Sequence, residues 1–452
     1  MSKPVDIHCH VFNRDILTYR ILFNLIESLV FAFIYRQKKK VNSNEITAFA
    51  GELRRIVNFL KAAMKESSVE VYNEMQAEYS KVYNQDFIIT PLTFDLYFCF
   101  KGSMRIKKKE EEISGEEMKS LTGNINRRVL VLLDKLEDEK VSLFKLKKHE
   151  NFPSLTTKEL EKLKDEIGSM IDFFKGKLNS AISEMREVKL VGSFKKQLNE
   201  VVQLRDLYPD RVFPFFAVDP RRFNIVNMAK KNVSKNGPFF GIKIYAPNGY
   251  SPTDPDLLKI YEFCVNENIP VTAHCSHVGF ATFENTIRIN GLINHPEKGL
   301  IEMKNEKYSF SIPFLGEDWI DERASVLNDP AIWEEVLKKF PGLKLNLAHF
   351  GKWDKGLDWT NRIFRLMHEY PTLYTDLSCV SEIEILEVFK AYWDGTRSDV
   401  KERFLYGSDY YFNLLYANSF NAYLQNFREL FSDNEFNQIA VVNPRKFLEI
   451  DI

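Results

Sequence analysis

Several features that would place this 452-residue chain in a special class are scarce or missing. Its five cysteines form no CxxC pair, so we expect neither a disulfide framework nor a cysteine-rich metal site. A reduced, cytoplasmic protein is the simplest interpretation. The formal net charge is only −1. This argues against nucleic acid as a partner, because nucleic-acid binders are normally strongly basic.

Long hydrophobic runs are also missing. Residues 1–11 are too short and too polar for a secretory signal. The apolar stretch 21–35 is interrupted by Asn24 and Glu27, whereas a membrane-spanning helix needs roughly 20 apolar residues. We interpret this stretch as a helix that covers a pocket or a subunit interface, and a membrane contact is the less favoured alternative. A homodimer is the oligomeric state that we expect.

Short runs rich in β-branched and aromatic residues recur along the chain, and helical patterns fill most of the intervals between them. No glycine-rich phosphate loop follows the first run, which argues against a nucleotide-binding sheet. Strands that alternate with helices form parallel sheets, and eight of them fit a closed (β/α)8 TIM barrel of the α/β class. The eight predicted strands are residues 4–10, 87–94, 212–219, 239–245, 269–274, 343–349, 373–376 and 404–409.

Two intervals are too long for simple crossovers. Residues 101–200, between the second and third strands, contain 22 Lys/Arg and 18 Asp/Glu, with apolar residues at helical spacing. We expect a charged helical insertion there, so that residues 1–100 and 201–452 form the barrel. The second interval, 276–342, contains proline, glycine and aromatic residues. We expect it to form loops at the carboxyl ends of the strands, where barrel enzymes place their specificity.

The most informative local motif is Asp6-Ile7-His8-Cys9-His10. Alternate side chains of a strand point to the same side, so His8 and His10 should face together and could bind one ion. An HxH pair alone is weak evidence. Three further predicted strands end in a polar residue after an apolar run, namely His274, His349 and Asp409. Because all strands of a parallel barrel open on one face, we expect these residues to converge.

With these motifs the chain resembles the amidohydrolase superfamily. Within it, the chain is most similar to the amidohydrolase-related branch that includes aminocarboxymuconate-semialdehyde decarboxylase and related TIM-barrel hydrolases. The matching segments extend from residue 5 to residue 448, and residues 101–200 are the clearest part outside the pattern. These segments are DIHCHVF, VTAHCSHVG, PAIWEEVLKKFPGLKLNLAHFG, YTDLS, LYGSDYY and VNPRKFL.

The resemblance implies a role for each matched residue. His8, His10, His274 and Asp409 would bind a divalent metal ion, for which three imidazoles and one carboxylate favour Zn²⁺. A bound ion of this kind lowers the pKa of its water to about 7. Asp409 would take the proton of that water, and His349 would stabilise the developing negative charge.

Lys243, at the end of the fourth predicted strand, has two interpretations. Binuclear amidohydrolases carry a carboxylated lysine there, in which case His349 would join a second metal ion. The alternative is a substrate-facing or structural lysine. Weaker candidates for substrate binding are Arg221, with its neighbour Arg222, together with Tyr245 and His277. Asp376 ends the seventh strand, and the resemblance gives it no firm role.

Three functions remain open at this point, the first two of which act on a small-molecule substrate. The favoured one is hydrolysis, in which hydroxide on the metal attacks a carbonyl-type centre. The second is non-oxidative decarboxylation of an aromatic or unsaturated acid. The third is a non-catalytic metal-binding barrel whose insertion binds a partner. The substrate and the identity of the metal are not encoded in these motifs.

Overall fold

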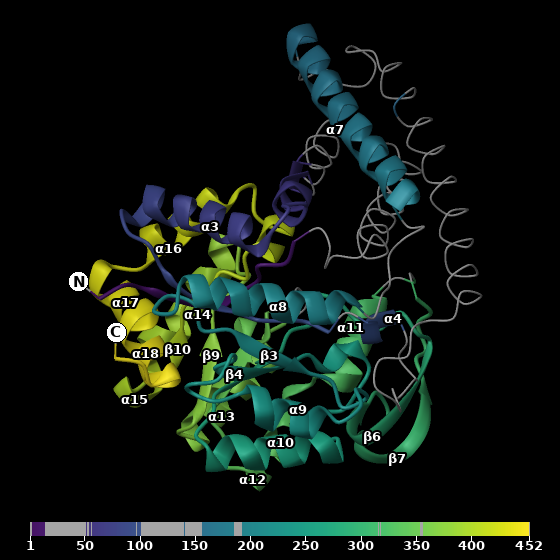
Figure 1. Ribbon diagram of the computed structural model, residues 1–452, viewed down its shortest axis with the longest axis vertical. Helices are drawn as coiled ribbons and strands as arrows, with labels where there is room; N and C mark the ends of the chain where they lie inside the picture. The colour runs from purple at the N-terminus through teal and green to yellow at the C-terminus, as the bar shows by residue number, and fades with distance from the viewer. Residues whose placement is uncertain are drawn as a thin grey trace. The chain divides into compact units, whose positions relative to one another are not determined.

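The computed structural model describes most of the chain (Figure 1). The described residues are 2–13, 51, 54–55, 57–95, 97–100, 140, 156–184, 192–314, 316, 318–352 and 356–451. The apolar stretch 21–35 and most of residues 101–155 lie outside them. The chain divides into two compact units. The first contains residues 1–11, 67–111 and 194–452, and the second contains residues 12–66 and 112–193.

All eight predicted strands are present in the first unit. Seven of them are shorter than the predicted runs, and β9 has the predicted bounds. Their bounds are β1 Val5–Cys9, β2 Ile88–Pro91, β3 Phe215–Val218, β4 Gly241–Ile244, β5 Val271–His274, β8 Leu345–Ala348, β9 Leu373–Asp376 and β10 Phe404–Leu405.

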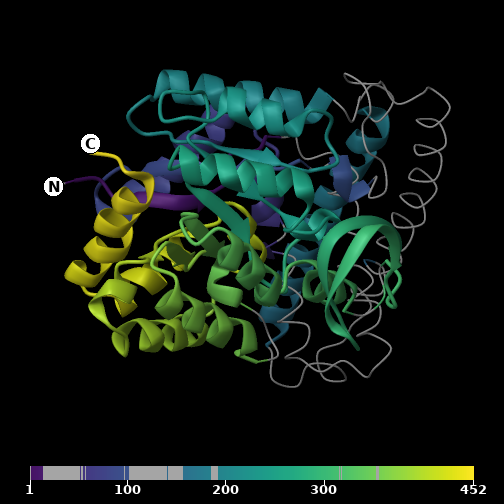
Figure 2. The ribbon, with the colours of Figure 1, turned by 90° about the horizontal axis from the view of Figure 1, so that it is seen from below.

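Helices lie between these strands in the sequence and around them in space. Figure 2 shows teal helices on one side of the strands and green helices on the other. The helices of the first unit are α3 Ser68–Tyr83, α4 Tyr97–Phe100, α8 Gly192–Leu207, α9 Ile225–Asn232, α10 Pro255–Asn266, α11 Trp319–Leu327, α12 Pro330–Lys339, α13 Asp358–Glu369, α14 Ile383–Asp394, α15 Ser398–Lys401, α16 Phe420–Leu430, α17 Asp433–Asn437 and α18 Asn443–Leu448. In the second unit, α7 spans Thr157–Glu184.

The strand pairing closes a barrel. Six strands form a parallel sheet in the order β10-β9-β8-β5-β4-β3, and β1 pairs with β2 in parallel. The eight strands therefore lie around the barrel in the order in which they occur in the sequence, β1-β2-β3-β4-β5-β8-β9-β10. This confirms the predicted (β/α)8 architecture. The two sets are joined by isolated parallel bridges, Ile89–Val212 and Leu92–Phe215 between β2 and β3, and Cys9–Tyr410 between β1 and the segment after β10.

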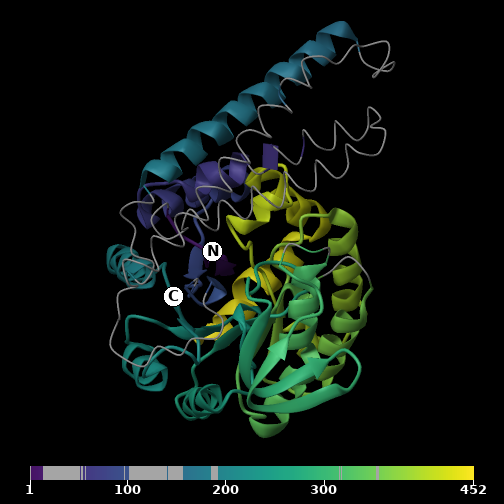
Figure 3. The same ribbon diagram turned by 90° about the vertical axis from the view of Figure 1, so that its right-hand side faces the viewer.

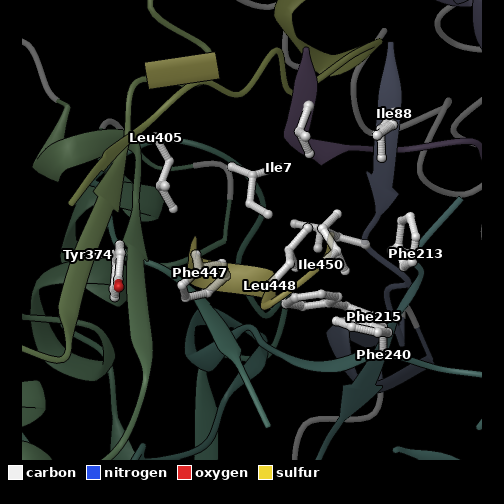
Figure 4. Close-up of a cluster of buried hydrophobic side chains, with 12 residues drawn as sticks. Ile7, Ile88, Phe213, Phe215, Phe240, Tyr374, Leu405, Phe447, Leu448 and Ile450 are labelled. Carbon is white, nitrogen blue, oxygen red and sulfur yellow. The ribbon is translucent and has the colours of Figure 1, made fainter. Parts of the chain in front are cut away.

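An apolar cluster fills the amino-terminal side of the barrel (Figure 4). Phe447 and Leu448 of α18 and the following Ile450 pack against residues near the beginnings of the strands. Phe215 on β3 belongs to this cluster, and a Cβ atom at Gly241 of the neighbouring β4 would lie 2.5 Å from its ring. Only glycine allows the two strands to approach there. Since this side is packed with hydrocarbon, the barrel can bind ligands only at its carboxyl-terminal side.

The interval 276–342 is more regular than the sequence suggested. It contains an antiparallel hairpin of β6 (Thr286–His295) and β7 (Gly299–Ser309), followed by α11 and α12. Ile287, Ile289 and Ile293 of β6 alternate with exposed or half-buried residues and pack against α11. This alternation is a strand signal that the expectation of loops missed. The hairpin faces the viewer in Figure 3.

A carboxylate close to the C-terminus ties together three loops at the packed side of the barrel. Glu449 accepts hydrogen bonds from Lys344, at 2.5 Å, and from Lys235 and Asn268. These three residues precede β8, β4 and β5, respectively. Partial burial raises the pKa of Glu449, but the hydrogen bonds from the two lysines and the asparagine outweigh it and hold the pKa at about 2, against 4.5 for a free glutamate.

We expect this cluster to stabilise the fold above pH 4.5 and to lose its contribution as the pH falls from 4.5 to about 2. Glu449→Gln should therefore lower the melting temperature at pH 7 and leave it unchanged near pH 2. The loss at pH 7 should stay within about 1 kcal/mol, because the group is partly exposed. Thermal unfolding followed across this pH range tests it. The control is Glu402→Gln, which removes an exposed carboxylate that pairs with Lys446 and should have a smaller effect.

Candidate metal centre

Five polar side chains meet where the strands of the barrel end. His8 and His10 come from the end of β1, His274 is the last residue of β5, His349 directly follows β8, and Asp409 follows β10. All five are buried. The structure thus brings together every residue that the sequence analysis named as a metal ligand or as a catalytic group.

Three of these side chains lie close enough together to share a cation, and the other two lie beside them. His10 Nε2 lies 3.1 Å and His8 Nε2 lies 3.5 Å from Asp409 Oδ1. His349 Nε2 lies 3.0 Å from His274 Nδ1. Among the described residues, the donor atoms of His8, His349 and Asp409 all lie within 4.8 Å of one another. His10 and His274 flank this group, each in contact with one of its members.

Each imidazole has an outer hydrogen-bond partner that determines its tautomer. A carbonyl or carboxylate oxygen can only accept, so the ring nitrogen beside it carries the proton, and the other nitrogen presents a lone pair to the centre. This arrangement is typical of metal-binding histidines. The pairs are His8 Nδ1 with Asp376 Oδ2 at 3.1 Å, His10 Nδ1 with Leu92 O at 2.8 Å, His274 Nε2 with Val278 O at 2.9 Å, and His349 Nδ1 with Ser378 O at 3.2 Å.

The contact between His274 and His349 shows that this site fits a cation. With the tautomers above, two lone pairs face each other across 3.0 Å, which is unfavourable unless a proton or a metal ion lies nearby. Burial lowers the pKa of both rings, and for His274 the charges of His349 and Lys243 lower it further. A proton is therefore disfavoured. Neutral imidazoles and a carboxylate are instead the ligand types of Zn²⁺ and similar divalent ions.

Asp376, to which the sequence analysis gave no role, organises the centre. Its carboxylate accepts hydrogen bonds from His8 Nδ1, from Asn346 Nδ2 at 2.7 Å and from the His349 amide at 3.0 Å. Ser378 donates to the same group through its amide and its hydroxyl. Burial raises the pKa of Asp376, but His8, His349 and the Ser378 hydroxyl outweigh burial and hold it well below the usual range. The one signal in the sequence is that Asp376 ends an apolar strand, as the ligands do.

The polar residues after β8, β9 and β10 adopt backbone conformations that glycine normally occupies. The φ angles of His349, Cys379 and Asp409 are 68°, 60° and 55°, and Phe350 follows at 48°. Such residues cost of order 1–3 kcal/mol each and persist where the surroundings hold them in place. The Phe350 carbonyl accepts a hydrogen bond from Thr360 Oγ1 at 2.8 Å. These turns direct His349 and Asp409 into the centre.

Lys243 on β4 lies close to the same group of charges. Its side chain is buried, and Nζ has no hydrogen-bond partner among the described residues. Burial lowers its pKa to about 8, although Asp376 and Asp409 raise it. An amine with a depressed pKa is both a reactive nucleophile and a costly buried charge. Both interpretations of Lys243 therefore stay open.

Tyr245 and His277, two of the weaker candidates, occupy different surroundings. Tyr245 stacks on His274 with ring centroids 4.4 Å apart, and its hydroxyl donates to Phe280 O at 2.9 Å. It forms a wall of the centre. His277 donates from Nδ1 to Asp321 at 2.5 Å and lines a cavity of about 730 Å³ together with Trp359. None of the five central side chains lines this cavity.

Arg221 and Arg222, which are weaker candidates for substrate binding, are paired with carboxylates of the protein. Arg221 is buried and donates to both oxygens of Asp219, at 2.8 and 2.6 Å. Arg222 makes the same kind of pair with Asp95, at 2.6 and 2.9 Å. Bidentate pairs of this kind neutralise the guanidinium. The pair of Arg222 and Asp95 connects the segments that follow β2 and β3, and substrate binding by Arg221 stays a prediction.

The family model described as Amidohydrolase matches residues 173–450, which is more than half of the 452-residue chain. No curated protein matches the sequence.

Several solved structures are similar to part of the chain. An uncharacterised TIM-barrel protein from Bordetella bronchiseptica is 15% identical, with 56% of this chain and 72% of that one covered and a TM-score of 0.37. A 2,6-dihydroxybenzoate decarboxylase from Rhizobium is 14% identical, with 56% and 78% covered and a TM-score of 0.36. A dihydroorotase from Saccharomyces cerevisiae is 15% identical, with 56% and 73% covered and a TM-score of 0.33.

The isolated amine of Lys243 leads to a stability prediction for the metal-free protein. Its pKa is about 8 in the folded chain and 10.5 in the unfolded one, so its proton destabilises the fold fully below pH 8 and not at all above 10.5. Lys243→Met should raise the free energy of unfolding at pH 7 by roughly 3 kcal/mol, at about 1.4 kcal/mol per pKa unit. Urea unfolding at pH 7 and pH 10.5 measures the gain and its disappearance.

Lys352 provides the matched control. It is equally buried, but its Nζ donates to Cys379 O at 2.7 Å and to Glu382 at 2.9 Å. Lys352→Met should therefore lower the stability of the metal-free protein, because it leaves the Cys379 carbonyl without its donor. A Lys243→Met variant that is less stable than the parent would contradict the prediction and would mean that the amine has a partner in the folded protein.

Proposed function

The chain belongs to the amidohydrolase family, and from this membership and the geometry of its centre we propose that it is a metal-dependent hydrolase of a small molecule. The observation that carries the proposal is the convergence of four imidazole lone pairs and the Asp409 carboxylate at the open side of the barrel. We propose that His8, His10, His274 and Asp409 hold the ion, with Zn²⁺ as the expected metal. His349 and Lys243 lie beside it.

The ion and the protein residues divide the chemistry between them. When bound, a divalent ion of this class lowers the pKa of a water molecule and polarises a carbonyl oxygen. Asp409 accepts the proton of the attacking water and then transfers it to the leaving group. A cation bound beside Asp409 would favour its ionised form, so the carboxylate would be ready to accept.

In its neutral form, His349 presents a lone pair to the centre and has no proton there with which to stabilise an oxyanion. Its Nδ1 donates to Ser378 O, so the neutral ring presents a lone pair from Nε2. Because burial lowers its pKa, the neutral form dominates at pH 7. Stabilisation of negative charge, the role that the resemblance implied, needs a proton on Nε2 and thus follows a proton transfer from the substrate or water.

The pairing of the arginines favours hydrolysis over decarboxylation. A decarboxylase has to bind the carboxylate of its substrate, and Arg221, with its neighbour Arg222, was a weak candidate for this contact. Its guanidinium is instead engaged by Asp219. The non-catalytic alternative is less favoured, because the buried side chains of His349 and Lys243 lie beside the four proposed ligands, and a structural zinc site needs no further groups of this kind.

The expected cellular location, oligomeric state and insertion are proposals as well. None of the helices in the described part of the chain has the length and hydrophobicity that crossing a lipid bilayer requires. All five cysteines are unpaired thiols, which supports a reducing compartment such as the cytoplasm. The homodimer and the charged insertion at residues 101–200 stay predictions.

The ligand assignment predicts different metal contents for two histidine variants. His274→Ala should lose most of its metal, because one of four ligands is removed. His349→Ala should keep about one ion per chain and lose turnover. Elemental analysis of the purified proteins measures both, and His295→Ala on the β6–β7 hairpin is the control, with full metal expected. The reverse result, metal lost in His349→Ala and kept in His274→Ala, would exchange the two roles.

The proposed reaction predicts activity that depends on the metal. The parent protein should hydrolyse at least one member of a panel of lactones, esters and amides, and chelation should reduce the rate by at least about a hundredfold. Added Zn²⁺ should restore it. The same panel should include hydroxybenzoates with carbon dioxide as the readout. Release of carbon dioxide without any hydrolysis would replace the proposal with decarboxylation, and full activity in metal-free protein would refute both.

A further inference from the structure

A second buried carboxylate, Asp6, lies two residues before His8 and does not reach the metal centre with its own side chain. It is completely buried, and each of its oxygens accepts two hydrogen bonds. Oδ1 accepts from two backbone amides, of His8 at 3.1 Å and of Ser408 at 2.9 Å. Oδ2 accepts from two hydroxyls, of Tyr79 at 2.7 Å and of Ser408 at 2.6 Å.

These hydrogen bonds connect the two strand ends that carry His8 and Asp409. Ser408 directly precedes Asp409, and its hydroxyl also accepts a hydrogen bond from the Tyr410 amide at 2.9 Å. The amides of Ser408 and Asp409 both donate to the His8 carbonyl, at 3.1 and 2.6 Å. Asp6 therefore restrains the backbone on both sides of the Asp409 carboxylate, where φ of Asp409 is 55°.

The position of Asp6 separates this role from metal binding. Its oxygens contact Tyr79 on α3 and the backbone of β1, whereas His8 and His10 direct their rings at Asp409. The only part of His8 that Asp6 touches, among the hydrogen bonds of the described chain, is its amide. Replacing Asp6 should thus change where the ligands lie without removing any of them.

We propose that Asp6 is a positioning residue that aligns Asp409 with His8, so that the two can bind one ion. This inference rests on the proposed function, because it presumes a metal at the centre. It assigns a role to the first residue of the motif Asp6-Ile7-His8-Cys9-His10, which the proposed function leaves without one. Residues that orient metal ligands typically change metal affinity by about 10- to 100-fold when they are removed.

The test compares Zn²⁺ affinities of the full-length protein by competition with a chromophoric chelator. Asp6→Ala removes all four acceptor contacts and should weaken binding by about 10- to 100-fold. Asp6→Asn keeps an oxygen for the two amides and turns its NH₂ toward the two hydroxyls, which can rotate to accept. The loss of Zn²⁺ affinity in this variant should not exceed the effect of one hydrogen bond, about two- to tenfold. The absorption spectrum of the Co²⁺-substituted protein reports whether the ligand geometry changes in Asp6→Ala.

Two further variants keep the result interpretable. Asp95→Ala removes another buried carboxylate, the partner of Arg222, and should leave Zn²⁺ affinity unchanged even if it destabilises the fold. If Asp6→Ala does not fold, Ser408→Ala takes its place. It loses the hydroxyl that links Asp6 to the Tyr410 amide and should weaken Zn²⁺ binding by about two- to tenfold.

The outcomes separate this inference from the proposed function. Absence of Zn²⁺ binding by the parent protein would refute the proposed function. Tight binding by the parent with equal affinity in folded Asp6→Ala, or in Ser408→Ala where that variant is used, would overturn the positioning role alone. Equal losses in Asp6→Asn and Asp6→Ala would overturn it too, because the amide retains the hydrogen bonds to the backbone.

Discussion

The centre of this protein depends on the direction in which four imidazole rings present their lone pairs. A neutral imidazole has one donor and one acceptor nitrogen, and the outer partner decides which is which. Here Leu92, Val278 and Ser378 supply carbonyl oxygens, and Asp376 supplies a carboxylate. Because each ring carries its proton on the nitrogen beside this oxygen, the nitrogen that faces the centre has a lone pair and cannot donate a hydrogen bond. The opposed lone pairs of His274 and His349 are then compatible only with a positive charge at the centre.

Buried carboxylates make this arrangement stable. Asp376 accepts from the His8 ring, the Asn346 amide group and the backbone of His349, and it thereby couples β1, β8 and β9 through one group. Asp6 makes a comparable set of contacts between β1 and the segment after β10. In a low-dielectric interior such networks are strong when every acceptor is used and costly when one is lost. The ligands are therefore held before any ion binds.

The two sides of the barrel are specialised in opposite ways. The amino-terminal side is packed with Phe215, Phe447 and other apolar residues, and Glu449 ties its loops together. The carboxyl-terminal side contains the left-handed residues His349, Cys379 and Asp409. It also contains the buried amine of Lys243, which has no hydrogen-bond partner in the described part of the chain. Strained backbone and buried charge both cost stability. Packing at one side offsets that cost at the other, which is the usual division in this fold.

The sequence by itself determined the strands, their parallel arrangement and the residues at their ends. Periodicity is a local property, and a polar residue after an apolar strand is visible without knowing its neighbours. These local patterns were sufficient to identify the candidate site residues His8, His10, His274, His349 and Asp409. Only the tertiary structure decided which groups those residues meet. The Asp376 contact with His8, the Asp219 pair of Arg221 and the tautomer of His349 depend on atoms brought together by strand pairing and turn geometry. The hydrogen-bond partner of a side chain is determined by that packing, so no periodic pattern in the sequence reveals it.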